Sequence, residues 1–207
     1  MLKRSSAFVA LFLLLTSVSA QDISFSGDSL ELVQARGKER TVLSGNARLV
    51  TQDSVITADR MELYNDFTFA VCSGNVRVSH TEKEIELSAD KLFYNRRDKI
   101  LQVQGNAVML DKKNEIVVKG GFIEDWEEDE ITIIQIGVRI LREDLVCRAE
   151  FARYLRAANK LELSGLPVVR LKDDEYRAAK IYVDLEDDTV RLEGKVQGTV
   201  RSDEQER

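Results

Sequence analysis

A unit of about 30 residues recurs along most of this chain, and it limits the possible folds more than any other sequence feature. Each copy has a small residue, a polar or acidic one, a spacer, and then two apolar residues separated by one position. The small residue stands at positions 27, 58, 89, 120, 149 and 178, so the steps are 31, 31, 31, 29 and 29. A second series, of glycines, interleaves with the first at 45, 74, 105, 165 and 194; only the fourth copy breaks step, with Gly137 about one residue late. Six phased copies predict a repeat architecture.

Apolar residues alternate with polar ones inside each copy. Leu101, Val103, Ala107 and Met109 share one side of such a segment, while polar residues mostly occupy the other. Strict alternation is typical of half-buried strands. Each copy is therefore expected to form two antiparallel strands joined by polar turns, and copies must stack because a single hairpin is only marginally stable in water.

The alternation slips by one residue at each small-acidic pair. Two residues separate Ala58 from Met61, although both face the same side. An extra residue of this kind predicts a β-bulge or corner that bends the strand. The acidic member suits a corner because its side chain can hydrogen-bond nearby backbone N–H groups: Asp28, Asp59 and Asp90. A ladder of catalytic or metal-binding aspartates is the alternative, but later copies carry Gly121, Glu150 and Ala179 instead.

Bent strands place each copy across two facing sheets. The sequence thus predicts an all-β, elongated antiparallel structure of about six repeats, with one apolar interior and two unpaired end strands. Proteins usually blunt such ends with proline, charge or cover. The chain contains one proline, so end-to-end pairing stays open.

The N-terminus resembles a secretory signal peptide. Basic Lys3 and Arg4 precede an apolar stretch from Ala7 to Leu15, and small residues follow, so cleavage is expected after Ala20. A retained anchor is the alternative, although the apolar stretch is shorter than the roughly 20 residues that a bilayer span requires. Export of the mature chain across a membrane is therefore expected.

Charge and histidine content exclude several function classes. Without Lys3 and Arg4, the 30 basic and 36 acidic residues become 28 and 36, a net charge of −8. An acidic chain is a poor candidate for binding nucleic acid, which depends on attraction to phosphate. The single histidine also leaves little room for histidine-based catalysis.

Two segments carry a resemblance to a known family. LSGNARLVTQDSVITADRMELY and CSGNVRVSHTEKEIELSADKLFY, within residues 43–94, resemble the OstA-like family of LptA-type proteins in their spacing from Gly-Asn to Ala-Asp and on to the following Leu or Tyr. The resemblance covers about residues 22–200 and weakens from Gly120 onward. It implies a β-taco, or β-jellyroll, domain over residues 21–200; residues 201–207 are expected to form a disordered charged tail.

The resemblance also implies a function without chemistry. An apolar groove would shield the acyl chains of lipopolysaccharide, or of a related glycolipid, between the inner and outer membranes, so the resemblance implies a periplasmic location. Copies would join head to tail, and the ends would meet inner- and outer-membrane transport components that carry related OstA-like domains. No catalytic residue, metal or cofactor is implied.

Inward positions of the alternating segments are the candidate groove lining. Each CH₂ group removed from water contributes roughly 0.8 kcal/mol, so an apolar trough can hold a lipid without a charged clamp. A groove and a packed sandwich share one pattern, so each residue is equally a core candidate. The candidates are Ala47, Leu49, Ile56, Met61, Leu63, Val76, Val78, Ile85, Leu87, Leu92, Val103, Ala107, Met109, Ile116 and Val118.

A few other residues admit a functional interpretation. Cys72 and Cys147 could pair in an oxidising compartment, or remain buried thiols at different phases of the repeat. His80 is expected in a solvated turn. The acidic run 124–130 around Trp126 lacks the spacing of a Ca²⁺ loop and favours a solvated turn. Trp126 is either a lipid or membrane contact or the occupant of an inward corner.

Two other function classes remain. A secreted polysaccharide-active enzyme on a β-helix also repeats, but it requires clustered acids or bases at fixed places, and no such cluster recurs here. A structural scaffold that polymerises through its end strands, without carrying lipid, is the third hypothesis.

Overall fold

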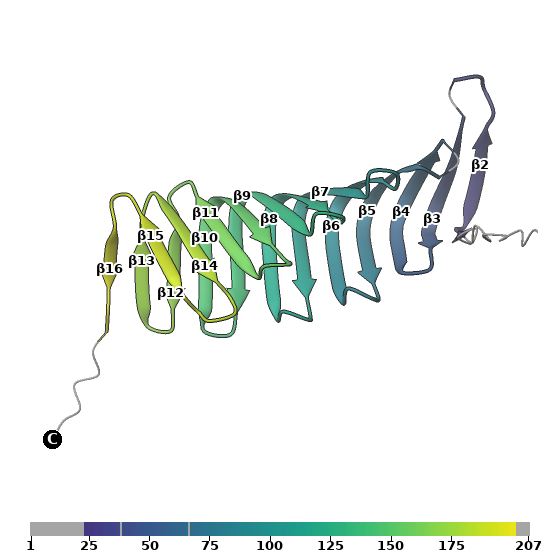
Figure 1. Cartoon of the computed structure of the whole chain (residues 1–207). Helices are drawn as coiled ribbons and strands as arrows, with labels where there is room; N and C mark the ends of the chain where they lie inside the picture. Colours follow the sequence, from purple (N-terminus) through teal and green to yellow (C-terminus); the bar gives the residue numbers. More distant parts are fainter. Residues whose placement is uncertain (1–22, 38, 66, 202–207) are drawn as a thin grey trace, which may run out of the picture.

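The chain forms an elongated stack of antiparallel strands, in which the long central strands lie side by side in sequence order (Figure 1). The computed structural model describes residues 23–37, 39–65 and 67–201, so the expected signal peptide lies outside the described residues. The strands are β1 (Ser24–Ser26), β2 (Ser29–Val33), β3 (Arg40–Val50), β4 (Ser54–Tyr64), β5 (Phe69–His80), β6 (Ile85–Asn95), β7 (Ile100–Asp111), β8 (Ile116–Trp126), β9 (Ile131–Arg142), β10 (Leu145–Leu155), β11 (Lys160–Ser164), β12 (Val168–Leu171), β13 (Asp174–Arg177), β14 (Lys180–Asp184), β15 (Val190–Glu193) and β16 (Gln197–Thr199).

The predicted all-β repeat fold is confirmed. Strands β3 to β10 pair in order, each with the next, and all pairs are antiparallel. Towards the C-terminus the long strands divide. The two halves of β10 pair with β11 and with β12, and from there β14 and β15 continue one branch while β13 and β16 continue the other.

The predicted corners lie where the ladders change register. Pairing jumps from Ser73 to Val76 in the β5–β6 ladder, and similar shifts recur in each ladder from β3 to β10. Gly74 and Asn75 fill the gap, and both have positive φ. A bulge of this kind bends a strand and re-aims the residues beyond it.

The aspartate of the preceding strand braces each of the first three corners. Asp59 Oδ2 accepts a hydrogen bond of 2.9 Å from the Asn75 side-chain amide, rather than from a backbone N–H as the sequence suggested. Equivalent bonds join Asn46 to Asp28 and Asn106 to Asp90. A Cβ at Gly74 would lie 2.3 Å from Asp59 Oδ2, so the corner requires glycine for space as well as for its φ of 74°.

The fourth copy keeps the corner but exchanges its residues. Ile136 takes the place of the usual glycine, with a φ of 67°, and Gly137 follows it with a φ of 66°. The facing residue is Gly121 instead of an aspartate, and a Cβ there would lie 2.9 Å from the Ile136 side chain. The irregular glycine spacing of the fourth copy is therefore a compensated substitution. The glycine that other copies carry on the bulged strand is replaced by Ile136, and the aspartate that faces it is replaced by Gly121.

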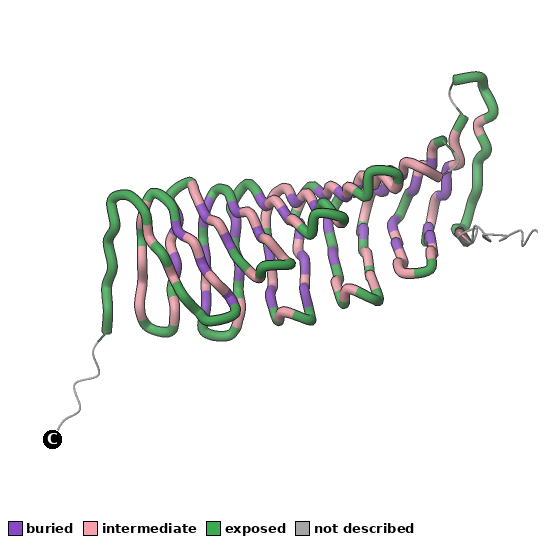
Figure 2. Tube along the Cα trace, viewed as in Figure 1, coloured by how far each residue is buried: buried purple, intermediate pink, exposed green. Residues whose placement is uncertain are grey.

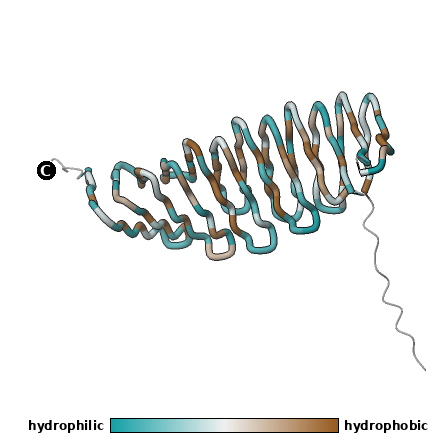
Figure 3. The backbone as a smooth tube through the Cα atoms, turned by 90° about the horizontal axis from the view of Figure 1, so that it is seen from above, coloured by the Kyte–Doolittle hydropathy of each residue, from teal (hydrophilic) through white to brown (hydrophobic). Residues whose placement is uncertain are grey.

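The bends divide the stack into two layers. Layer A contains residues 47–57, 76–88, 107–119 and 138–148 with β1, β12, β13 and β16. Layer B contains residues 60–65, 67–73, 91–104, 122–135 and 151–164 with β2, the first half of β3, β14 and β15. Buried side chains of both layers form one core cluster. In the view from above, successive copies are narrow loops lying side by side, with apolar stretches recurring along them (Figure 3).

The turns form two edges opposite the corners. Edge A, at the end of layer A, holds the turns at 51–53, 81–84, 112–115 and 143–144. Edge B, at the end of layer B, holds residues 65 and 67–68 and the turns at 96–99, 127–130 and 156–159. Backbone hydrogen bonds continue from turn to turn, as from Arg96 N to Thr68 O and from Glu127 N to Lys99 O. Each edge is therefore a regular ladder, and the space between the two edges is the mouth of the interior.

Both ends of the stack are exposed, as Figure 2 shows by colour. Among the described residues, β1 and β2 at the N-terminal end each pair with β3 alone, and at the C-terminal end β15 pairs only with β14 and β16 only with β13. Leu30 and Leu32, on β2, are 48% and 58% exposed. Within the described residues, each layer therefore ends in a strand with an unpaired edge.

Candidate lipid-binding groove

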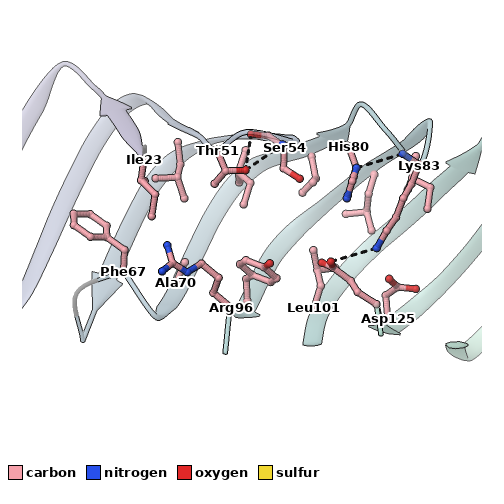
Figure 4. A pocket seen from close by; sticks show the side chains of 17 residues that line it. Ile23, Thr51, Ser54, Phe67, Ala70, His80, Lys83, Arg96, Leu101 and Asp125 are labelled. Carbon is pink, nitrogen blue, oxygen red and sulfur yellow. Dashed lines mark hydrogen bonds and ion pairs between the residues drawn. The ribbon is translucent and has the colours of Figure 1, made fainter. Parts of the chain in front are cut away.

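An apolar groove opens between the two edges in the N-terminal copies (Figure 4). Leu49, Ile56 and Leu87 come from layer A, while Ala70 and Leu101 come from layer B. The alternation places these side chains inward because every second residue of a strand faces the same side. Ile23 and Phe67 flank the N-terminal end of the groove, where the Phe67 ring stacks on Phe25 with 5.5 Å between centroids.

The fifteen candidate lining residues all lie in the interior, but only some of them reach the groove. Leu49, Ile56, Val78, Ile85 and Leu87 line it. The other ten are buried in the core cluster and do not line it: Ala47, Met61, Leu63, Val76, Leu92, Val103, Ala107, Met109, Ile116 and Val118. Sequence alternation identified the inward side of each strand. Which inward residues line the groove and which are packed in the core depends on how the two layers come together. Lipid contact by any of these residues stays a prediction.

The groove is narrow in this conformation. Its cavity volume is about 70 Å³, roughly half of the ~150 Å³ with which an engineered apolar cavity holds one benzene molecule. An acyl chain therefore requires the layers to separate further. Beyond the groove the interior is closely packed, because Ile123, Ile134 and Ile140 are fully buried.

An ion pair crosses the mouth where the groove ends. Lys83 Nζ, on edge A, lies 3.3 Å from Glu127 Oε2, on edge B, and both side chains are partly buried. His80, the last residue of β5, accepts a hydrogen bond of 3.4 Å at Nδ1 from the Lys83 backbone N–H. The prediction of a solvated His80 is wrong: the residue is half-buried and lines the groove, and desolvation, with a smaller contribution from Lys83, holds the pKa of its imidazole below the usual value.

A buried polar cluster closes the interior just behind this ion pair. Asp125 lies at the inner end of the groove, and its carboxylate pairs with the Arg156 guanidinium and accepts a 2.6 Å hydrogen bond from Thr132 Oγ1. The Arg156 side chain is only 7% exposed, and desolvation lowers its pKa. The acidic run 124–130 is therefore not a uniformly solvated turn. The alternation of inward and outward residues could have revealed the burial of Asp125, because Asp125 is two residues after the inward Ile123.

Two more polar contacts cross the mouth further along. Tyr154 Oη, on layer B, donates a 3.4 Å hydrogen bond to Asp111 Oδ2, at edge A. Arg142, at edge A, donates to the Leu185 carbonyl and pairs with Asp188 at 3.2 Å, both beyond β14 at edge B. Together with Lys83–Glu127, we call these three contacts the straps. In each, the partner on edge B comes 43, 44 or 46 residues later in the chain.

The straps divide the molecule into an open half and a closed half. Residues 51–54 on edge A face residues 96–99 on edge B at the corresponding position in the first copies, and no hydrogen bond or ion pair joins these two segments. The copies are therefore not interchangeable, although their sequences repeat. The difference lies in a few side chains at the edges rather than in the repeated pattern.

The remaining candidate residues lie apart from the groove. Cys72 and Cys147 are both buried free thiols, and burial raises the pKa of each to about 12. Trp126 is 40% exposed on the outer face, while its neighbour Asp125 faces inward, so an inward corner role for Trp126 is wrong. Its Nε1–H donates to Glu124.

The described residues contain neither a metal-binding cluster nor a membrane-spanning helix. No group of three or more His, Cys, Asp or Glu side chains in residues 23–37, 39–65 and 67–201 is placed to hold a metal ion. Over the same residues, no helix has the length and hydrophobicity that crossing a bilayer requires.

Comparison with known proteins places the chain in a family. The sequence profile of the OstA-like protein family matches residues 23–162. The chain belongs to the OstA-like family. The matched region covers the whole groove and the first two straps, and strands β12 to β16 lie beyond it. The extension of the OstA-like domain to residue 200 stays a prediction.

One solved structure and the curated sequences complete the comparison. LptH of Pseudomonas aeruginosa, described as the LptA-homologous periplasmic component of the lipopolysaccharide transport device, is 12% identical, with a TM-score of 0.29 over 88% of this chain and 96% of that one. No curated protein sequence matches.

Proposed function

We propose that this OstA-like protein is a periplasmic carrier that shields acyl chains of lipopolysaccharide, or of a related glycolipid, between the inner and outer membranes. The observation that carries the proposal is the apolar groove between the two layers, open to the mouth in the N-terminal copies of a chain that belongs to this family. A carrier of this kind binds and releases lipid without bond chemistry.

The groove supplies the driving force by burying hydrocarbon. At roughly 0.8 kcal/mol for each CH₂ removed from water, ten methylenes would contribute about 8 kcal/mol, minus the free energy of separating the layers. The groove is too narrow for a chain as it stands, so binding is coupled to opening. A ligand can shift the layers only by its greater affinity for the open form.

Loading is expected to begin at the N-terminal copies. The mouth has no strap there, and Lys83–Glu127 is the first contact that a lipid would meet on its way along the stack. This ion pair is partly exposed, so it opens at low free-energy cost. The buried Asp125–Arg156 pair is a larger barrier, because separating it would leave a buried charge without its partner.

The unpaired ends suit the head-to-tail assembly and the partners that the family resemblance implies. Edge strands with free N–H and C=O groups pair readily with another chain. In such an assembly, β1 of one molecule would pair with β16 of the next, and β2 with β15. A related domain in a membrane component could take the place of either molecule.

Protection of a lipid probe tests the proposal. A fluorescent lipid A analogue should become shielded from a water-soluble quencher when the exported protein is added. Leu87→Asp, which places a charge on the groove wall, should abolish the protection. Leu163→Asp alters a buried position of the strapped half outside the groove and controls for general destabilisation.

The outcomes separate the candidate functions. Absence of protection by the wild-type protein, or equal protection by Leu87→Asp, would refute the carrier. Normal assembly into filaments by a protein that never protects the probe would favour a structural scaffold. Turnover of a glycan would favour the enzyme hypothesis.

A further inference from the structure

The two outer faces of the molecule differ in how their charges are balanced. On layer B, five outward-facing cations pair with carboxylates of the same layer: Arg40 and Arg60 pair with Glu62, Arg153 with Glu162, Lys160 with Asp184, and Arg191 with Glu193. Lys91 and Lys180 of this layer form no ion pair with a described residue. On layer A, several outward cations of the described strands form neither an ion pair nor a side-chain hydrogen bond: Arg48, Arg77, Lys119, Arg139 and Arg148.

Three of these cations lie directly side by side. Lys119 of β8 is opposite Arg139 of β9, which is opposite Arg148 of β10, and all three are exposed. We call them the basic row. Like charges directly opposite each other destabilise a sheet. At the outward layer A positions of β8, β9, β10, β12 and β13, the one acidic residue is Glu175. It accepts a hydrogen bond from Arg177, which lowers its pKa, and Arg170 and Arg148 add a smaller Coulomb attraction.

An apolar row runs beside the basic row. Leu110, Val117, Leu141 and Val146 lie opposite one another on β7, β8, β9 and β10, two residues nearer to edge A. Leu141 is 37% exposed and the other three are partly exposed. Their outward position follows from the alternation, because the intervening residues, such as Val118 and Ile140, are buried.

We propose that the outer face of layer A binds the surface of a phospholipid bilayer that carries anionic headgroups. The basic row would lie among the phosphates while the apolar row contacts the boundary of the acyl chains. A surface that combines cations with an adjacent apolar stripe is suited to the interface of an anionic membrane. The chain as a whole is acidic, so this attraction comes from the local arrangement and not from net charge.

The chemistry of the face favours a bilayer over an acidic protein. No hydrogen bond from the described residues orients the Arg139 or Arg148 guanidinium, and the outward strand positions of layer A carry no aromatic side chain. Protein interfaces usually centre on aromatic anchors and well-oriented arginines. A bilayer offers many mobile anions, which cations in a line can meet without a fixed geometry.

The inference goes beyond the carrier function. Both rows follow the cross-strand direction, which is the long axis of the stack, so the bound molecule would lie along the membrane. The groove mouth, between the edges, stays separate from this face. Vesicle binding and lipid-probe protection can therefore fail independently.

Vesicle binding with matched charge variants tests the inference. Exported protein would be floated with vesicles of phosphatidylglycerol mixed with phosphatidylcholine, and with phosphatidylcholine alone. The test variant combines Lys119→Gln, Arg139→Gln and Arg148→Gln. The control combines Arg153→Gln, Lys160→Gln and Arg191→Gln, which removes the same three charges from layer B. Far-UV circular dichroism would check that both variants fold.

The wild-type protein should bind the anionic vesicles and not the neutral ones, and added salt should weaken the binding. Since each cation near an anionic membrane surface contributes about 1 kcal/mol, the layer A variant should bind about a hundredfold more weakly. The layer B control should change by less than about fivefold, because its charges are already paired. Binding of wild-type protein to neither vesicle, or equal losses in the two variants, would overturn the inference.

Discussion

The corner of the second copy permits a quantitative test of what bends the strands. Gly74→Ala should destabilise the fold for two separable reasons. A non-glycine residue in the left-handed region costs roughly 1–2 kcal/mol. The new Cβ would also lie 2.3 Å from Oδ2 and 3.0 Å from Cβ of Asp59, so turning the carboxylate away cannot remove the whole clash.

Displacing the Asp59 carboxylate also breaks its hydrogen bond from Asn75. A hydrogen bond to a charged group contributes about 1.5–3 kcal/mol, and less where water can replace the partner, as at this exposed corner. Together the terms predict a loss of about 3–4 kcal/mol in the free energy of unfolding. Gly137→Ala is the matched control: its φ is 66°, but nothing lies within 4 Å of the new Cβ, so only about 1–2 kcal/mol should be lost.

Urea unfolding of the single and double variants would measure both terms. The double variant Gly74→Ala with Asp59→Gly imitates the fourth copy, where Ile136 faces Gly121. Its loss should be smaller than the sum of the single losses by at least about 1 kcal/mol. Equal losses in Gly74→Ala and Gly137→Ala, or simple additivity in the double variant, would refute the reasoning.

Three further predictions concern the groove and the interior. Glu127→Gln should open the strap at Lys83 and speed capture of the lipid A probe severalfold in stopped-flow fluorescence, and an unchanged rate would argue against a gate. The folded-state pKa of His80 lies below its unfolded value of 6.5, so protonation favours the unfolded chain. In urea titrations, the stability of the wild-type protein should therefore fall relative to that of His80→Gln as pH decreases through about 6.5. Parallel pH profiles of the two proteins would contradict this. Cys72 and Cys147 should react with a maleimide only after unfolding, because both thiols are buried and their pKa is about 12; rapid labelling of folded protein would show that the interior opens freely.

Local sequence determined the repeat, the strands and the corners. Alternation is a property of neighbouring residues, so it fixed which side of each strand faces inward: all fifteen candidate residues lie in the interior. The extra residue at each small-acidic pair predicted the bends, and spacing alone indicated the family that the comparison identifies. The fourth copy seemed irregular only because Ile136 occupies a position that usually requires glycine.

Tertiary structure decided where the interior stays open. A groove and a packed sandwich have the same alternation, so no pattern within one copy distinguishes Leu87, at the groove, from Val118, in the filled half. The distinction depends on contacts such as Lys83–Glu127, whose partners are more than 40 residues apart and belong to opposite edges. Such pairs come together only when strands have bent and copies have stacked. The chain alone therefore specifies an apolar interior, while the side chains that join the two edges across the mouth meet only in the folded stack.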